Sequence, residues 1–174
     1  MGRPTMTDNF YLTGESVSDG KPYPYRSCGL DGIFLLNGYE IHHHDGEPHV
    51  VIKDMDGLHV AIGTHLVLSR KALAPKELRF LRKTLDMSQA ELAEKLGNTS
   101  QSVARWEKGE VEIPGPAEKF LRAYFLARNL SDRSDLETLR TLIVEGLEQL
   151  DATDEQARPV QFKLTKHWTQ QEAA

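Results

Sequence analysis

The sequence lacks the residues that mark several large classes of protein. It has a single cysteine, Cys28, among 174 residues, which excludes an internal disulfide and a zinc site built from several thiolates. No hydrophobic run approaches the roughly 20 residues of a membrane-spanning helix. The polar N-terminus also lacks the apolar region of a secretory signal. We therefore expect a cytoplasmic protein in a reducing compartment, with no membrane partner.

Positive charge is also scarce. The chain has 21 Lys and Arg residues against 26 Asp and Glu, a net charge of −5, which argues against a generally basic nucleic-acid coat. Residues 1–74 carry 6 basic and 9 acidic side chains, residues 75–125 carry 9 and 8, and residues 126–174 carry 6 and 9. Only the middle segment is not acidic. Any contact with DNA must therefore come from a local patch in that segment.

Motifs of catalysis are missing too. The chain contains no phosphate-binding loop and no suggestive order of Ser, His and Asp, and Cys28 lies in no motif that marks a nucleophile. We predict that the protein is not an enzyme and needs no cofactor, and we interpret Cys28 as an inert thiol.

The best-defined motif that is present occupies residues 88–109. Ser88 and Glu91, three residues apart, predict a capping box that opens a first helix. Gly97 suits the end of that helix, and Thr99 can cap a second one. Small or apolar residues stand at the inward positions of both helices: Leu92, Ala93, Leu96, Val103 and Trp106. This pattern predicts a helix-turn-helix.

Residues 75–125 resemble the XRE family of helix-turn-helix domains, which includes the lambdoid phage repressors and Cro and the HigA-like and MqsA-like antitoxins. The resemblance lies in residues 92–97, 100–103 and 105–109. Asn98 departs from the pattern, because many members have an aliphatic residue there. The layout is similar to that of the MqsA-like group, but a single cysteine cannot build the four-thiolate zinc module of that group.

The expected DNA contacts lie on the second helix of the motif. A helix in the major groove presents its N-terminal turn and then the residue one turn further on to the bases, which are here Ser100, Gln101 and Arg105. Gln101 can pair with adenine N6 and N7, and Arg105 with guanine O6 and N7. The alternative is that these side chains are only solvated. Gln89 resembles the phosphate-anchoring glutamine of the family. Weaker phosphate candidates are Ser102, Lys108 and Arg82.

The whole chain predicts an α+β protein. Residues 1–27 are expected to form an irregular arm, and residues 28–70 a small α+β domain made of a hairpin and a helix. Residues 75–127 are expected to form an all-α, five-helix domain of XRE type that binds DNA. Residues 131–174 then add a helix and a strand.

Within the first half, residues 33–41 are rich in strand formers, and Gly38 among them marks a bulge or a turn. Asp45-Gly46 is a hairpin signal before a return strand over residues 49–53. Asp56 is the expected N-cap of a helix of about three turns. Four residues are expected on its buried face: Leu58, Ala61, Ile62 and Leu66.

In the second half, Pro75 is the expected first residue of a helix with Arg82 on its outer face. Residues 134–150 predict a helix with a wide apolar stripe. Residues 159–168 alternate between apolar and polar, which predicts a strand. That strand can complete the N-terminal hairpin, pair across a dimer, or form an exposed binding edge.

Histidines gather before residue 70. His42 and His44 share a face of the predicted strand, and a hairpin can bring His49 opposite them, which makes these three weak candidates for metal ligands. Their spacing is not diagnostic of any metal site, and we favour a polar strand face with no metal.

These features predict a sequence-specific transcriptional regulator, a homodimer on a palindromic operator in double-stranded DNA. From the layout and the resemblance, we expect an autorepressing antitoxin of a type II toxin–antitoxin system, with a cognate toxin as partner. The alternative is a stand-alone regulator whose N-terminal half senses a ligand or a metal. A histidine-ligated metalloenzyme fused to a DNA-binding domain is the least favoured alternative.

Overall fold

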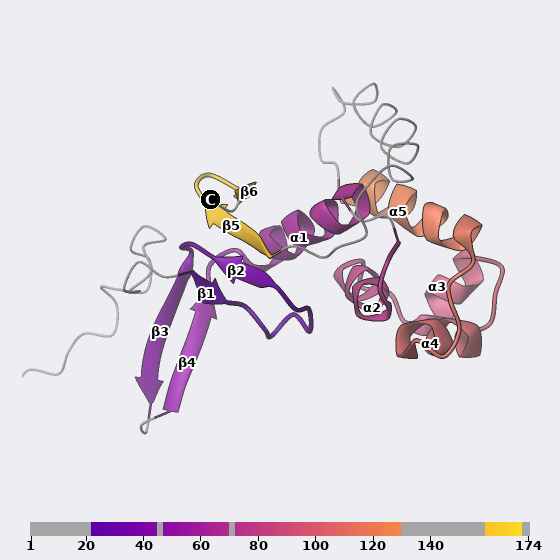
Figure 1. The fold of residues 1–174 in the computed structure, drawn as a ribbon, viewed down its shortest axis with the longest axis horizontal. Helices are drawn as coiled ribbons and strands as arrows, with labels where there is room; N and C mark the ends of the chain where they lie inside the picture. Colours follow the sequence, from indigo (N-terminus) through magenta and orange to yellow (C-terminus); the bar gives the residue numbers. More distant parts are fainter. Residues whose placement is uncertain (1–21, 45–46, 70–71, 130–158, 172–174) are drawn as a thin grey trace, which may run out of the picture. The chain divides into compact units, whose positions relative to one another are not determined.

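A computed structural model describes residues 22–44, 47–69, 72–129 and 159–171. These residues form an α+β protein, as predicted (Figure 1). The chain divides into two compact units. Unit 1 contains Met1–Arg26, Asp31–Leu58 and Pro159–Ala174, and unit 2 contains Ser27–Leu30 and His59–Arg158.

Unit 1 contains a four-stranded sheet in the order β1-β2-β5-β6, built from β1 (Tyr23–Pro24), β2 (Ile33–Leu35), β5 (Val160–Leu164) and β6 (Trp168–Gln171). β2 and β5 are parallel, whereas the two outer pairs are antiparallel. Alternate residues of the central strands are buried, which is typical of a sheet with one covered face. The buried residues of these strands are Ile33, Leu35, Val160, Phe162, Leu164 and Trp168.

A second sheet in unit 1 is the antiparallel pair of β3 (Tyr39–His44) and β4 (Glu47–Ile52), which confirms the predicted hairpin. Residues 33–41 are divided into β2 and β3, which belong to different sheets, and the break between them contains Gly38, the residue predicted to mark a bulge or a turn. Gly38 explains the break. Its φ of +75° is rarely adopted by residues with a side chain, and an added Cβ would lie 2.5 Å from Cη2 of Trp168.

The first of the three predicted alternatives for the final strand, that it completes the N-terminal hairpin, was wrong, because β5 pairs with β2 and not with the β3–β4 hairpin. Asn37 and Leu164, 127 residues apart in sequence, fasten this junction, since the Asn37 amide donates to the Leu164 carbonyl at 2.9 Å and accepts from its N–H at 2.7 Å. The single strand predicted over residues 159–168 is instead the antiparallel pair of β5 and β6.

Helix α1 (Met55–Ser69) begins two residues earlier than predicted. Asp54, not Asp56, caps it, because Asp54 Oδ1 accepts a hydrogen bond from the Gly57 N–H at 3.1 Å. Three of the expected inward residues are buried, whereas Ala61 is half-buried. The buried three are Leu58, Ile62 and Leu66.

The described residues of unit 2 include four further helices, α2 (Pro75–Thr84), α3 (Gln89–Lys95), α4 (Ser100–Lys108) and α5 (Gly115–Asn129). Pro75 is the first residue of α2, as predicted. Arg122 of α5 is buried, and its guanidinium donates to Glu118 and to the carbonyls of Leu66 and Val67, which ties α5 to the end of α1. The helix predicted over residues 134–150 lies outside the described residues.

Candidate nucleic-acid interface

Helix α3 begins with the predicted capping box. The Glu91 N–H donates to Ser88 Oγ at 3.1 Å, and the Ser88 N–H donates to Glu91 Oε2 at 2.7 Å. The hydrogen bonds from the backbone and side chain of Ser88 favour the ionised carboxylate, so they lower the pKa of Glu91 below its usual value. The box satisfies amides at a helix start that would otherwise have no partner within the helix.

The turn between α3 and α4 depends on a glycine and a second cap. Gly97 has a φ of +62°, a conformation that glycine adopts without strain. Thr99 then caps α4, since its Oγ1 accepts a hydrogen bond from the Ser102 N–H at 3.1 Å. Asn98 is exposed, and its N–H donates to the Ala93 carbonyl at 2.8 Å. Both predicted helix boundaries are therefore fixed by local hydrogen bonds.

Helix α4 has one buried and one exposed side. Val103 and Trp106 are buried, which confirms that Trp106 belongs to the core. Ser100, Gln101 and Arg105, the predicted base-reading residues, are all exposed. The Arg105 side chain is 54% exposed, and its Nε lies 3.6 Å from Glu110 Oε2. This pair is solvated and weak, so it leaves the guanidinium available to a ligand.

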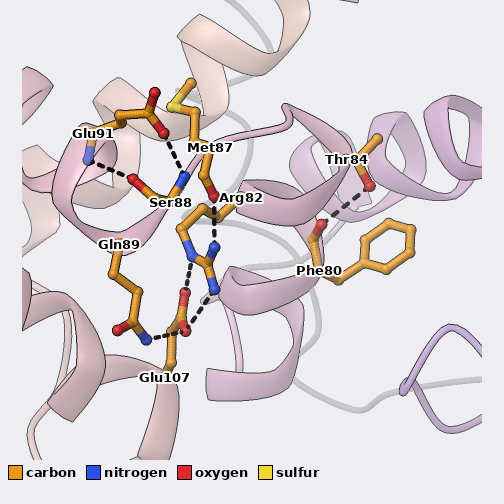
Figure 2. A network of polar contacts seen from close by, with 8 residues as sticks. All are labelled: Phe80, Arg82, Thr84, Met87, Ser88, Gln89, Glu91 and Glu107. Carbon is orange, nitrogen blue, oxygen red and sulfur yellow. Dashed lines mark hydrogen bonds and ion pairs between the residues drawn. The ribbon is translucent and has the colours of Figure 1, made fainter.

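Glu107 of α4 is the centre of a polar network that joins α2, α3 and α4 (Figure 2). Its carboxylate accepts hydrogen bonds from Arg82 Nε at 2.5 Å, Arg82 Nη2 at 3.1 Å and Gln89 Nε2 at 2.8 Å. Arg82 Nη1 also donates to the Met87 carbonyl at 2.6 Å. The Arg82 and Glu107 side chains are only 10% and 4% exposed, so this ion pair is largely shielded from water.

The expected place of Arg82 on the outer face of α2 was therefore wrong. Arg82 is one helical turn after Leu78 and directly follows Leu81, which places it on the buried stripe of the helix. Glu107 was not among the predicted site residues. Its position next to the inward-facing Trp106 is the signal in the sequence that indicates partial burial.

The comparison with family models supports the same segment. Residues 78–116 match the model described as Helix-turn-helix. This segment is an XRE-type helix-turn-helix. The match supports a DNA-binding transcriptional regulator. The comparisons with curated proteins and with solved structures found no match.

The remaining phosphate candidates lie around the helix-turn-helix. Gln89 is half-buried at the start of α3, with one N–H of its amide directed to Glu107. Ser102 is half-buried, and its hydroxyl lies 2.9 Å from Thr99 Oγ1. Lys108 is exposed at the end of α4, with Nζ 3.8 Å from Glu110.

The histidine candidates belong to the β3–β4 hairpin of unit 1. His42 and His49 are directly opposite each other, and His42 Nε2 lies 3.2 Å from Glu40 Oε2. Within the described part of the chain, no three His, Cys, Asp or Glu residues are grouped so that they could hold a metal ion. Nor do any of the described helices have the length and apolar character needed to cross a bilayer.

Proposed function

We propose that α4 lies in the major groove of DNA and reads its sequence through Ser100, Gln101 and Arg105. The observation that carries this proposal is the division of α4, whose other side is anchored by the buried Val103 and Trp106. Ser100 and Gln101 in the first turn of α4, and Arg105 in the next turn, are therefore exposed together. A glutamine amide matches the donor and acceptor of adenine in this groove, and a guanidinium matches the two acceptors of guanine.

Phosphate contacts around α4 would fix its position on the duplex. Gln89 has a second amide N–H besides the one given to Glu107, and this N–H can donate to a phosphate oxygen. Ser102 and Lys108 can contribute further contacts. Arg82 is left out of this set, because its guanidinium is engaged by Glu107 and Met87.

The charge of the chain favours binding as a homodimer on a palindromic operator. Residues 75–125 carry 9 basic and 8 acidic side chains, so one copy gains little from general attraction to phosphates. Two copies on two half-sites add their contacts, and a two-fold symmetric protein matches a palindromic site.

Binding to DNA selected from a random pool, followed by gel shifts on the selected site, tests the reading helix. Arg105→Ala and Gln101→Ala should each weaken specific binding by about 1–3 kcal/mol. Lys108→Ala should weaken binding to all DNA sequences alike. It should also reduce the slope of log binding constant against log salt concentration by about one. Arg128→Ala, an exposed arginine at the end of α5, is the matched control. Unchanged binding in both Arg105→Ala and Gln101→Ala would refute the assignment of α4.

We further propose that the regulator represses its own promoter as the antitoxin of a type II pair. Support comes from the layout, an α+β unit joined to a helix-turn-helix, and from the acidic residues 1–74, which suit a basic toxin. The protein should copurify with a small basic toxin encoded beside it and neutralise it.

The absence of such a neighbour would favour the alternative, a stand-alone regulator whose N-terminal half senses a ligand or a metal. The paired His42 and His49 are the observation that favours a metal. Elemental analysis of the purified protein separates these cases, since a metal sensor should hold a stoichiometric metal ion.

A further inference from the structure

The β3–β4 hairpin has two outer edges that differ in their hydrogen-bonding groups. The two strands lie side by side (Figure 1), and among the described residues neither pairs with any other strand. The Lys53 N–H donates to the Gly38 carbonyl at 2.9 Å, which marks these two residues as a hydrogen-bonded pair. Bonded and non-bonded pairs alternate along an antiparallel ladder. The register therefore decides which backbone groups face outward.

The non-bonded pairs are Tyr39–Ile52, Ile41–Val50 and His43–Pro48. On β3 the outward N–H groups belong to Tyr39, Ile41 and His43. Tyr39 is only 2% exposed, so the accessible groups are those of Ile41 and His43. On β4 one outward position is Pro48, which has no N–H to donate. Proline at such a position is a common means of blocking a sheet edge. The β4 edge is thus blocked, whereas the β3 edge keeps accessible donors and acceptors at Ile41 and His43.

We propose that the β3 edge pairs with the β3 edge of a second copy of this chain, in antiparallel register about a two-fold axis at Ile41. This inference rests on the homodimer proposed above, and it assigns the β3 edge as the dimer interface. A two-fold axis at Ile41 brings outward-facing residues opposite one another, with two backbone hydrogen bonds between the two copies of Ile41. An axis at Glu40 or at His42 would also do so, but it would place two carboxylates or two imidazoles opposite each other.

The side chains are complementary in the same register. Glu40 comes to lie opposite His42 of the second copy, and His42 opposite its Glu40, so each side offers a carboxylate to an imidazole. On the other face, Ile41 and Val50 are half-buried, and pairing makes a continuous apolar strip from the two copies. A two-stranded sheet by itself is only marginally stable in water, and four strands remove that weakness.

Two proline substitutions in the full-length protein test the interface. Ile41 and Val50 are cross-strand neighbours, both half-buried and both with outward N–H groups. Neither proline removes a hydrogen bond within the hairpin. In sedimentation equilibrium, Ile41→Pro should raise the dimer dissociation constant at least about tenfold, because it removes the two bonds at the axis. Val50→Pro should leave the dissociation constant unchanged.

A cysteine cross-link keeps the test decisive if Ile41→Pro fails to fold. In a Cys28→Ser background, Ile41→Cys should form an intermolecular disulfide, since bonded pairs lie about 5.5 Å apart between Cα atoms. Val50→Cys is the control, because three strand spacings of about 4.8 Å separate its two copies. A dimer that survives Ile41→Pro, or equal cross-linking through Val50→Cys, would overturn the interface but leave the homodimer standing. A wild-type protein that is monomeric at about 100 μM would overturn both.

Discussion

Removal of the Glu107 carboxylate should lower the free energy of unfolding of unit 2 far more than the loss of a surface charge. Glu107→Ala deletes the acceptor of three hydrogen bonds from Arg82 and Gln89. Among the described residues, the Arg82 side chain, 10% exposed, then keeps the Met87 carbonyl as its acceptor. Breaking one side of a buried ion pair costs about 3–5 kcal/mol. That is a large share of a typical free energy of unfolding, about 5–15 kcal/mol.

Urea unfolding followed by tryptophan fluorescence can measure this loss. The chain has two tryptophans, Trp106 in unit 2 and Trp168 in unit 1, so a Trp168→Phe background reports on unit 2 alone. Glu110→Ala is the control. Glu110 is 50% exposed beside Arg105, and its loss should change the free energy of unfolding by no more than about 0.5 kcal/mol.

The pair of substitutions Arg82→Met and Glu107→Leu separates the contribution of charge from that of packing. Apolar residues of similar volume often replace a buried ion pair without loss of stability, so the double variant should be more stable than Glu107→Ala. If Glu107→Ala lowers the free energy of unfolding by less than about 1 kcal/mol, the network does not hold the three helices together, and the reasoning is refuted.

Three further substitutions test the local structure. Gly38→Ala should destabilise unit 1, because the φ of +75° disfavours a side chain and the new Cβ would overlap Trp168. The fluorescence change of Trp168 should then occur at a lower urea concentration than in the wild type. An unchanged urea midpoint would contradict this prediction. Thr99→Ala should lower the free energy of unfolding of unit 2 by about 1 kcal/mol through loss of the α4 cap, measured in the same urea experiment. Glu91→Gln should reduce the acid sensitivity of unit 2. Since the pKa of Glu91 is lowered in the folded state, its contribution is present above the unfolded pKa and is lost as pH falls through the folded pKa, so urea midpoints of the variant should fall less between neutral and acidic pH.

The helix-turn-helix could be predicted in detail because its boundaries are set by neighbours in sequence. The Ser88–Glu91 box, the Gly97 turn and the Thr99 cap each involve residues within a few positions of one another. The burial of Val103 and Trp106 follows from helical periodicity. The sequence pattern therefore predicted these elements, and the exposure of Gln101 and Arg105, without knowledge of the rest of the fold.

The sheets of unit 1 could be predicted only in part, because their pairing joins distant residues. The hairpin is local and was recognised from its turn signal. The parallel pairing of Ile33 with Val160 has no local signal. Gly38 predicts a bulge or a turn, but no nearby residue indicates that β2 and β3 belong to different sheets. Arg82 shows a related difficulty. The charge of Arg82 predicts an exposed side chain, whereas its position on the apolar stripe predicts a buried one. The side chain is buried because Glu107, from another helix, pairs with it.

The place of β5 in its sheet has a consequence for the order of events during synthesis. β5 lies between β2 and β6, so β2 lacks one neighbour until residue 164 has left the ribosome. All the residues of the helix-turn-helix are made before that moment, and its contacts are short-range, which favours early folding. A ribosome-bound chain ending before Pro159 would therefore expose the β2 edge to other chains while its DNA-binding segment is already complete. The interval between these two stages is a period in which the growing protein is open to wrong strand pairing and to capture by chaperones.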